Sequence, residues 1–216
     1  MLFNSYAFII GYLPVTMAGF FWIAQSSVRL AGLWLVSASL FFYGWWNPAF
    51  VVLILASITF NYALGCAIAH VRQKSLRQAR YLTMAAVVTN LGSLAYYKYA
   101  NFIIFNVSQL TGFEYSGASI ILPLGISFFT FTQIAFLVDV YRGVAREYNF
   151  AHYTLFVTYF PHLIAGPLLH HKQMMPQFEQ LETYKIDLHN ISLGLTVFIF
   201  GLAKKVLLAN QFALYV

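Results

Sequence analysis

The sequence predicts an all-α fold: a polytopic bundle of transmembrane helices with about five to seven membrane segments, one of them broken or re-entrant. Of the 216 residues, 61% are hydrophobic and only 8% are charged, whereas soluble domains carry roughly 25% charged residues. Aromatic residues make up 19% of the chain, and their rings suit the headgroup level of a bilayer. Because so few charges cannot cover a water-facing surface, lipid must surround most of the chain. We expect one membrane domain over residues 1–216.

The first three apolar runs each approach the roughly 20 residues that a helix needs to cross a bilayer. They extend from Phe3 to Ala24, from Val28 to Trp46 and from Ala49 to Ala69. Pro14 interrupts the first run, and a membrane helix tolerates proline where neighbouring groups satisfy the freed carbonyl. Each run therefore predicts one span.

A polar stretch from His70 to Arg80 follows the third run and carries four positive charges and no negative one. Cytoplasmic loops collect Lys and Arg, so this stretch predicts a cytoplasmic loop. Counting three spans back places the N-terminus on the extracytoplasmic side. Arg29, between the first two spans, then falls on the cytoplasmic side as well.

Further membrane segments are predicted beyond this loop, from Tyr81 to Tyr97, Ser119 to Val138 and Leu188 to Leu208. The run from Asn101 to Leu110 is too short to span. We expect it to lie in the interface or to enter and leave the membrane on one side. Asn61 and Asn90 lie in the middle of predicted spans, where hydrogen bonds between helices account for such residues.

The segment from Phe150 to Leu169 is apolar but contains two prolines and a glycine, so it cannot form one uninterrupted helix. Either it spans with a break, or it enters and leaves on one side. Irregular backbone at membrane depth survives only where protein or a water-filled cavity lines it. We therefore predict that the segment lines a substrate tunnel or cavity, with the candidate residues Pro161, His162, Gly166 and Pro167.

His162 is an ionisable residue at this break, and such residues inside a membrane are functional candidates. It can bind a substrate oxygen or relay a proton; the alternative is a histidine hydrogen-bonded to backbone that the break has freed. His170 and His171 would project about 100° apart on a helix. Since no carboxylate or thiol stands nearby at ligand spacing, we predict no metal site.

Other polar residues in the predicted spans are additional candidates. Ser127 and Gln133 offer polar groups inside one membrane helix, and we add them to the cavity candidates. Lys98 stands among tyrosines at a helix end, where it is either an interfacial anchor or a substrate-binding lysine. Asp139 and Arg142 are three residues apart, so they can form an ion pair on one helix face. We expect that pair to be structural.

Several short motifs follow one another along nearly the whole chain. They are Met1–Ser5, Phe41–Trp45, Tyr97–Tyr99, Leu122–Phe131, Asp139–Gly143, Phe160–Pro167 and Gly201–Lys205. In this order and spacing they resemble the membrane-bound O-acyltransferase superfamily. The most similar branch is the bacterial one that includes the membrane proteins of alginate O-acetylation and of D-alanyl transfer to teichoic acids.

This resemblance implies an acyltransferase of the bacterial cytoplasmic (inner) membrane. Family members surround a tunnel in which a cytoplasmic acyl donor, such as acetyl-CoA or an acyl carrier, meets an acceptor from the other face. The implied partners are the lipid bilayer, an extracytoplasmic acyltransferase and a polysaccharide acceptor such as alginate. We expect no bound cofactor and no nucleic acid. The family's histidine base would act on the acceptor hydroxyl.

The chain departs from the family in length. The family histidine belongs to the later half of the fold, beyond residue 216, and His162 is not its counterpart. Position 170, often arginine in relatives, is His170 here. The resemblance therefore implies an N-terminal half that lacks the catalytic residue and is inactive alone. The alternatives are a non-catalytic membrane scaffold and a transporter-like component of a polysaccharide export system.

Overall fold

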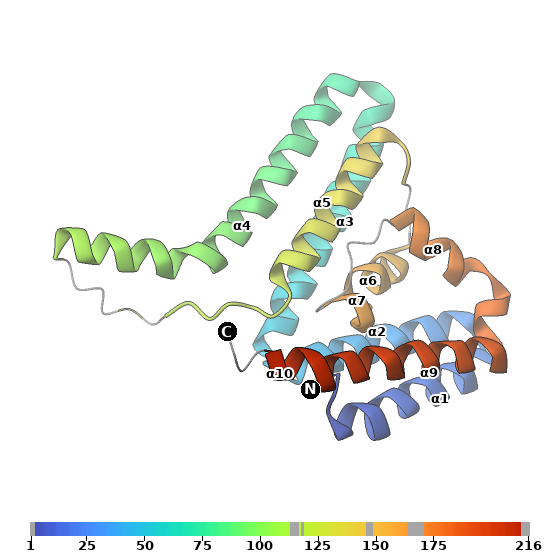
Figure 1. Ribbon diagram of the computed structural model, residues 1–216. Helices are drawn as coiled ribbons and strands as arrows, with labels where there is room; N and C mark the ends of the chain where they lie inside the picture. Colours follow the sequence, from blue (N-terminus) through green and yellow to red (C-terminus); the bar gives the residue numbers. More distant parts are fainter. Residues whose placement is uncertain (1–2, 113–116, 118, 146–148, 164–170, 213–216) are drawn as a thin grey trace. The chain divides into compact units, whose positions relative to one another are not determined.

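The computed structural model consists of helices and their connections, and it describes residues 3–112, 117, 119–145, 149–163 and 171–212 (Figure 1). These residues contain no strand, which confirms the predicted all-α class. The helices are η1 (Ala7–Tyr12), α1 (Leu13–Ala24), α2 (Val28–Gly44), α3 (Ala49–Lys74), α4 (Leu76–Thr111), α5 (Ile126–Arg142), α6 (Phe150–Thr158), α7 (Phe160–Leu163), α8 (His171–Glu179), η2 (Leu181–Tyr184), α9 (Leu188–Ala203), η3 (Lys204–Ala209) and α10 (Asn210–Phe212).

The chain divides into two compact units. The first unit consists of Met1–Ala31 and Gln180–Val216, and the second of Gly32–Glu179. Three helical stretches in the described part of the chain are long and apolar enough to cross a membrane: Ala7–Ala24, Ala49–Lys74 and Leu188–Phe212. The fold is therefore that of a membrane helical bundle.

The first span begins with a π-helical turn. In η1 the hydrogen bonds skip one residue more than in an α-helix, and the N–H of Leu13 donates to the carbonyl of Phe8. Pro14 follows directly at the start of α1. It has no N–H to donate to Ile10, so the regular α-helical ladder cannot continue through this turn. The predicted interruption at Pro14 therefore takes the form of a change of helix type within one continuous run.

The predicted loop from His70 to Arg80 is mostly helical, which corrects its extent. Helix α3 continues to Lys74 and α4 begins at Leu76, so only Ser75 has extended backbone, with φ −155° and ψ 112°. Most residues of the stretch, namely its three Arg, two Gln, one Lys, one Leu and one Ala, are good helix formers. The Ser75 hydroxyl accepts a hydrogen bond from the N–H of Gln78 at 3.4 Å and so caps the new helix.

Helix α4 also extends further than predicted, because the run from Asn101 to Leu110 continues it without a break to Thr111. No proline or glycine interrupts this run, and the helix ends at Gly112, whose φ of 69° suits a glycine C-cap. The Asn101 side chain then forms hydrogen bonds with Ile120, in the segment that precedes α5. Its Nδ2 donates to the carbonyl of Ile120 at 2.7 Å, and its Oδ1 accepts from the N–H of Ile120 at 3.0 Å.

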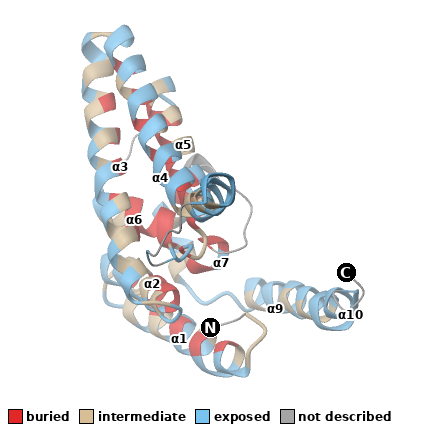
Figure 2. Ribbon diagram, turned by 90° about the vertical axis from the view of Figure 1, so that its left-hand side faces the viewer, coloured by how far each residue is buried: buried red, intermediate tan, exposed pale blue. Residues whose placement is uncertain are grey.

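Helices α3, α4 and α5 pack together as the core of the second unit, and their buried residues face one another (Figure 2). On α3 these residues recur three or four positions apart: Ile54, Ile58, Asn61, Gly65 and Ile68. A side chain at Gly65 would place its Cβ 2.8 Å from Cε1 of Phe136 on α5. Close helix approach over small residues, with polar residues between the helices, is typical of membrane bundles.

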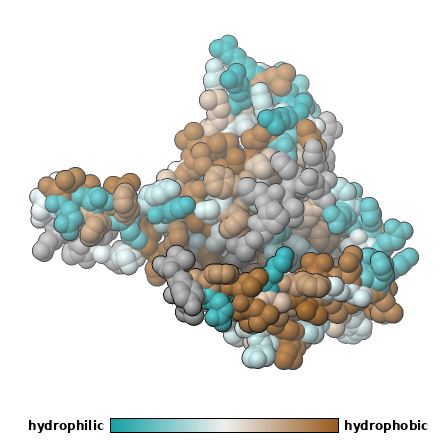
Figure 3. All heavy atoms as spheres, in the orientation of Figure 1, coloured by the Kyte–Doolittle hydropathy of each residue, from teal (hydrophilic) through white to brown (hydrophobic). Residues whose placement is uncertain are grey.

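Large apolar side chains cover much of the outside of both units. Trp22 is 75% exposed and Val88 is 68% exposed. In Figure 3 hydrophilic atoms gather where α3 meets α4, whereas hydrophobic atoms dominate along α1 and α9. Helices α9 and η3 bury none of their described side chains. Such a surface suits lipid rather than water.

Candidate functional site

The predicted break lies between α6 and α7. Helix α6 ends at Thr158, Tyr159 has φ −50° and ψ 108°, and α7 then runs from Phe160 to Leu163. Pro161 has no N–H to donate to the carbonyl four residues back, so one continuous helix through this point would lose a hydrogen bond. Pro161 instead occupies the first turn of α7, where proline is well tolerated. The structure thus confirms a broken segment and places the break at Tyr159.

A serine of α2 compensates for part of this break. The N–H of Phe160 donates to Oγ of Ser39 at 3.3 Å, and Ser39 is completely buried. The ring of Phe160 also packs against Phe42, with 5.5 Å between the ring centroids. Backbone groups away from water need such partners. Helix α2 therefore fixes where α7 begins.

His162 is buried directly after the break and is only 6% exposed. Its ring packs against Tyr159, with centroids 5.7 Å apart. Among the residues that the structure describes, neither ring nitrogen has a hydrogen-bond partner of good geometry, and the backbone of Phe156 provides a weaker polar contact. A buried imidazole in this condition has capacity left for a ligand or water. Of the other predicted residues of this segment, Pro161 is exposed, and Gly166, Pro167 and His170 lie outside the described residues.

Two buried tyrosines in the same unit are functional candidates that sequence reasoning missed. The hydroxyls of Tyr43 on α2 and Tyr153 on α6 are buried without a hydrogen-bond partner in the described part of the chain. Tyr153 is fully buried, and its ring lies 4.6 Å from that of Phe136. Both tyrosines belong to the same core cluster as Leu163 of α7. Their phenols can donate hydrogen bonds to a polar ligand or to water.

Gln133 and Ser127 lie on α5, as the sequence analysis predicted, but at different depths. Gln133 is completely buried, and its Oε1 accepts a hydrogen bond from Oγ of Ser57 at 3.3 Å. Its Nε2 has no partner among the described residues. Ser127 is half-buried near the start of the helix. An unpaired amide donor at membrane depth is costly unless a ligand or water satisfies it.

Lys98 lies apart from these residues, on the exposed surface of α4. Its Nζ is 5.6 Å from the centroid of the Tyr99 ring, a distance at which a cation and an aromatic ring attract each other. No hydrogen bond in the described part of the chain joins Lys98, Ser127, Gln133 or His162 to one another. The predicted candidates therefore occupy separate positions on α4, α5 and α7, and their role as cavity residues stays a prediction.

Asp139 and Arg142 lie at the C-terminal end of α5, and their ion pair stays a prediction. Asp139 is 7% exposed, and its carbonyl oxygen accepts hydrogen bonds from Val144 and Ala145. Arg142 is exposed. The arginine that contacts this helix end is Arg72 of α3, which was not among the predicted residues. Its Nε donates to the carbonyl of Tyr141 at 2.8 Å, and its Nη2 donates to the carbonyl of Arg142 at 3.3 Å.

Asn61 and Asn90 confirm the predicted hydrogen bonding between helices. Each amide donates to the other's oxygen, at 3.1 Å and 2.7 Å. They line a cavity of about 260 Å³ between α3, α4 and α5, with Thr89, Ser93 and Thr130 among its other polar lining residues. No group of three or more metal-binding side chains occurs in the described residues. The polar side chains at the cavity carry amide and hydroxyl groups, which can both donate and accept hydrogen bonds.

The chain is similar along 99% of its length to bacterial acetyl-transfer proteins. It is 37% identical to the peptidoglycan O-acetyltransferase of Helicobacter pylori, of which it covers 45%. It is 37% identical to the probable alginate O-acetylase AlgI of Pseudomonas aeruginosa, covering 41%, and 36% identical to that of Azotobacter vinelandii, covering 42%. No family model and no solved structure matches the chain.

These relatives are members of the membrane-bound O-acyltransferase family, and the chain is similar to them over nearly its whole length. The chain spans less than half the length of the curated relatives it matches. The names of these relatives refer to O-acetylation, of peptidoglycan in one case and of alginate in the other two. The apolar helices agree with a lipid environment.

Proposed function

We propose that the chain is part of a membrane O-acetyltransferase that acts on the hydroxyl groups of an exported polysaccharide such as alginate. The single observation that carries this proposal is the similarity of 99% of the chain to probable alginate O-acetylases, at 37% and 36% identity for two of them. The buried polar groups of the second unit support it, because an acyl-transfer path through a membrane needs hydrogen-bonding groups where lipid offers none.

Peptidoglycan is the second candidate acceptor. The relative from Helicobacter pylori, a peptidoglycan O-acetyltransferase, is as similar as the alginate O-acetylase of Pseudomonas aeruginosa, at 37% identity. Both acceptors are carbohydrate polymers with free hydroxyls. The chemistry at the acceptor is therefore the same, and the two proposals differ only in the polymer.

In this proposal the residues 1–216 form part of a single membrane domain and do not contain the histidine base. Residues 1–216 instead line part of the acyl-transfer path through the membrane. His162 and Gln133 are buried and keep hydrogen-bonding capacity in the described part of the chain, so we assign them to contacts with the acyl group or with ordered water. The acyl donor is acetyl-CoA or an acyl carrier on the cytoplasmic side.

The proposed orientation places the N-terminus outside the cytoplasm and the α3–α4 connection inside. Arg72, Lys74, Arg77 and Arg80 support this orientation, since cytoplasmic segments collect positive charge. The proposed location is the bacterial cytoplasmic membrane. An extracytoplasmic acyltransferase would receive the acyl group on the outer side of this membrane and pass it to the polymer.

The test is genetic and chemical. The gene is deleted, and the O-acetyl content of alginate-like exopolysaccharide and of peptidoglycan is measured by NMR in the deletion strain and after complementation. Loss of acetyl groups from one polymer, restored by the full-length gene, supports the proposal and names the acceptor. Unchanged acetylation of both polymers, together with a loss of polymer export, would favour the scaffold or transporter alternative.

A further inference from the structure

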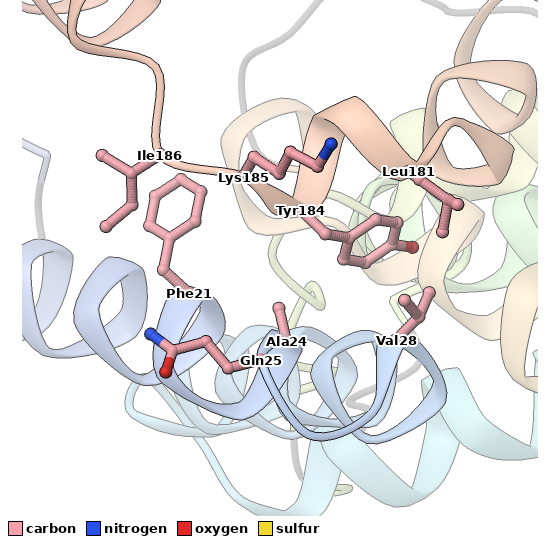
Figure 4. Close-up of a pocket in the computed structure, with 8 residues that line it drawn as sticks. All are labelled: Phe21, Ala24, Gln25, Val28, Leu181, Tyr184, Lys185 and Ile186. Carbon is pink, nitrogen blue, oxygen red and sulfur yellow. The ribbon is translucent and has the colours of Figure 1, made fainter.

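A pocket of about 420 Å³ lies in the first unit, and all of its lining residues belong to that unit. Residues of α1 and the start of α2 form one wall, and residues 181–186 form the other. Its lining residues are Phe21, Ala24, Gln25, Val28, Leu181, Tyr184, Lys185 and Ile186. Figure 4 shows Ala24 directed toward Tyr184, and Phe21 toward Ile186, so the two walls face each other. Its volume is within the range of known ligand pockets.

Aromatic packing holds the two walls together. The ring of Tyr184 lies 5.4 Å from that of Phe20, with an angle of 32° between the ring planes, and Phe20 is only 7% exposed. Partial burial also raises the pKa of the Tyr184 hydroxyl, so this ring is a neutral part of the wall at physiological pH. The short helix η2 is therefore anchored on α1, and the pocket is a defined feature of the unit.

The pocket lies where two apolar spans end. One span, Ala7–Ala24, ends at the pocket, and the other, Leu188–Phe212, begins two residues after Ile186. Both spans expose apolar side chains along their length, including Trp22 at 75% and Val197 at 64%. The ends of membrane spans lie at the level of the lipid headgroups. The pocket is thus placed between water and the hydrocarbon region.

The polar groups at the pocket favour an anion. Lys185 supplies an ammonium group and Gln25 an amide, and Arg29 is exposed directly after the lining residue Val28. Both carboxylate oxygens of the nearby Asp187 accept hydrogen bonds from the first turn of α9. Glu182 is exposed and does not line the pocket. An apolar interior with cationic groups beside it matches an amphiphile with a negatively charged head.

We propose that this pocket binds an anionic phospholipid, with the acyl chains against the apolar wall and the headgroup phosphate at Lys185. This proposal is independent of the acetyl-transfer reaction. Positive side chains close to a membrane surface attract anionic lipids with about 1 kcal/mol each. The pocket also restricts where the acyl chains can bind, so we expect the binding to be saturable and specific to this site.

The experiment uses the full-length gene product in detergent and native mass spectrometry of lipid adducts. The probes are phosphatidylglycerol, phosphatidylcholine with the same acyl chains, and inorganic phosphate as a competitor. Wild-type protein should retain phosphatidylglycerol about fivefold better than phosphatidylcholine, without competition from inorganic phosphate. Lys185→Gln should abolish this preference, and Ala24→Phe, which fills the pocket, should reduce the retention of both lipids.

The matched control is Lys74→Gln, because Lys74 is also exposed beside a span but is distant in sequence from the pocket and does not line it. It should keep the preference for phosphatidylglycerol. An equal loss in Lys185→Gln and Lys74→Gln would overturn the proposal in favour of non-specific charge attraction. Full competition by inorganic phosphate would overturn it in favour of a free-anion site. Should Ala24→Phe fail to fold, Val28→Phe tests the same filling from the other helix.

Discussion

Asn61 of α3 and Asn90 of α4 exchange two side-chain hydrogen bonds, with Nδ2-to-Oδ1 distances of 3.1 Å and 2.7 Å. Each amide also donates to a carbonyl one turn back on its own helix, Asn61 to Ser57 and Asn90 to Ala86. The pair therefore has every amide proton bonded. It fixes the register of the two helices, because these directional bonds form in only one alignment.

Replacing one partner should destabilise the bundle because the other amide is left unsatisfied. We expect Asn90→Ala to lower the free energy of unfolding by about 1–2 kcal/mol, measured by unfolding of the full-length protein in mixed micelles. Asn106→Ala is the control, since within the described residues that exposed amide donates only to the carbonyl of Phe102, on the same helix. Equal effects of the two variants would refute the register role. A double-mutant cycle with Asn61→Ala would isolate the pair energy.

Gly143 ends α5 in a position that only glycine fits. Its φ is +79°, and a Cβ would come within 2.5 Å of Nη2 of Arg72, the group that bonds to the end of this helix. We expect Gly143→Ala to cost about 1–2 kcal/mol from backbone strain alone, and more because Arg72 must move. The measurement is again unfolding of the full-length protein.

Gly112 provides the control for this prediction. It also has a positive φ, +69°, but no atom of the described residues lies within 4 Å of the position that a Cβ would take. Gly112→Ala should therefore show the strain alone. If both variants lose the same stability, the contact between Arg72 and the end of α5 contributes nothing measurable.

Gly65 is needed for the approach of α3 to α5. A methyl group there would lie 2.8 Å from Cε1 of Phe136, so Gly65→Ala should destabilise by about 1–3 kcal/mol through overpacking. Phe136→Leu in the same protein should restore part of the loss. The control Gly92→Ala has open space around its Cβ and should be neutral or stabilising, because alanine favours a helix by up to about 1 kcal/mol.

His162 should matter for transfer more than for folding. In the full-length protein we expect His162→Ala to reduce acetyl transfer about tenfold, the equivalent of one hydrogen bond to a bound group, while expression in the membrane stays normal. His189→Ala is the control, at an exposed position in the first turn of α9. Unchanged expression and unchanged transfer in His162→Ala would remove His162 from the functional site.

The orientation can be checked with a protease tag. A tag inserted after Ser75, between α3 and α4, should be protected from protease added outside the cell and cleaved only after lysis. A second tag after Gly112, beyond the end of α4, should be cleaved from outside. The reversed pattern would place the N-terminus in the cytoplasm and contradict the charge argument.

Three of the apolar runs, at residues 3–24, 49–69 and 188–208, correspond to the helices that are long and apolar enough to span, because this property depends on length and composition alone. Helix α2 begins at Val28 and α3 at Ala49, as their sequences predicted. The polar stretch at residues 70–80 resembles a loop in composition because it is strongly charged, yet Arg, Lys and Gln are good helix formers and the stretch belongs to the ends of α3 and α4. Only Ser75 carried a clear boundary signal, as an N-cap residue.

The site was predictable only in part. The break could be predicted from Pro161, because proline has no N–H to donate to the helical hydrogen-bond pattern. The burial of the Tyr43 and Tyr153 hydroxyls could not be predicted from the sequence. Tyrosine is common at membrane interfaces, and whether it is buried depends on tertiary packing. The contact of Arg72 with the end of α5 joins residues 69 and 70 positions apart, so no local pattern could reveal it.

The most direct test of the proposed function is acetyl transfer by purified protein. The full-length gene product is reconstituted in liposomes with acetyl-CoA labelled in the acetyl group, polymer on the opposite side and the extracytoplasmic acyltransferase where one is encoded nearby. The proposal expects labelled O-acetyl groups on the polymer with the full-length protein and none with residues 1–216 alone. Turnover by residues 1–216 alone, or movement of label across the membrane without any covalent transfer, would contradict it.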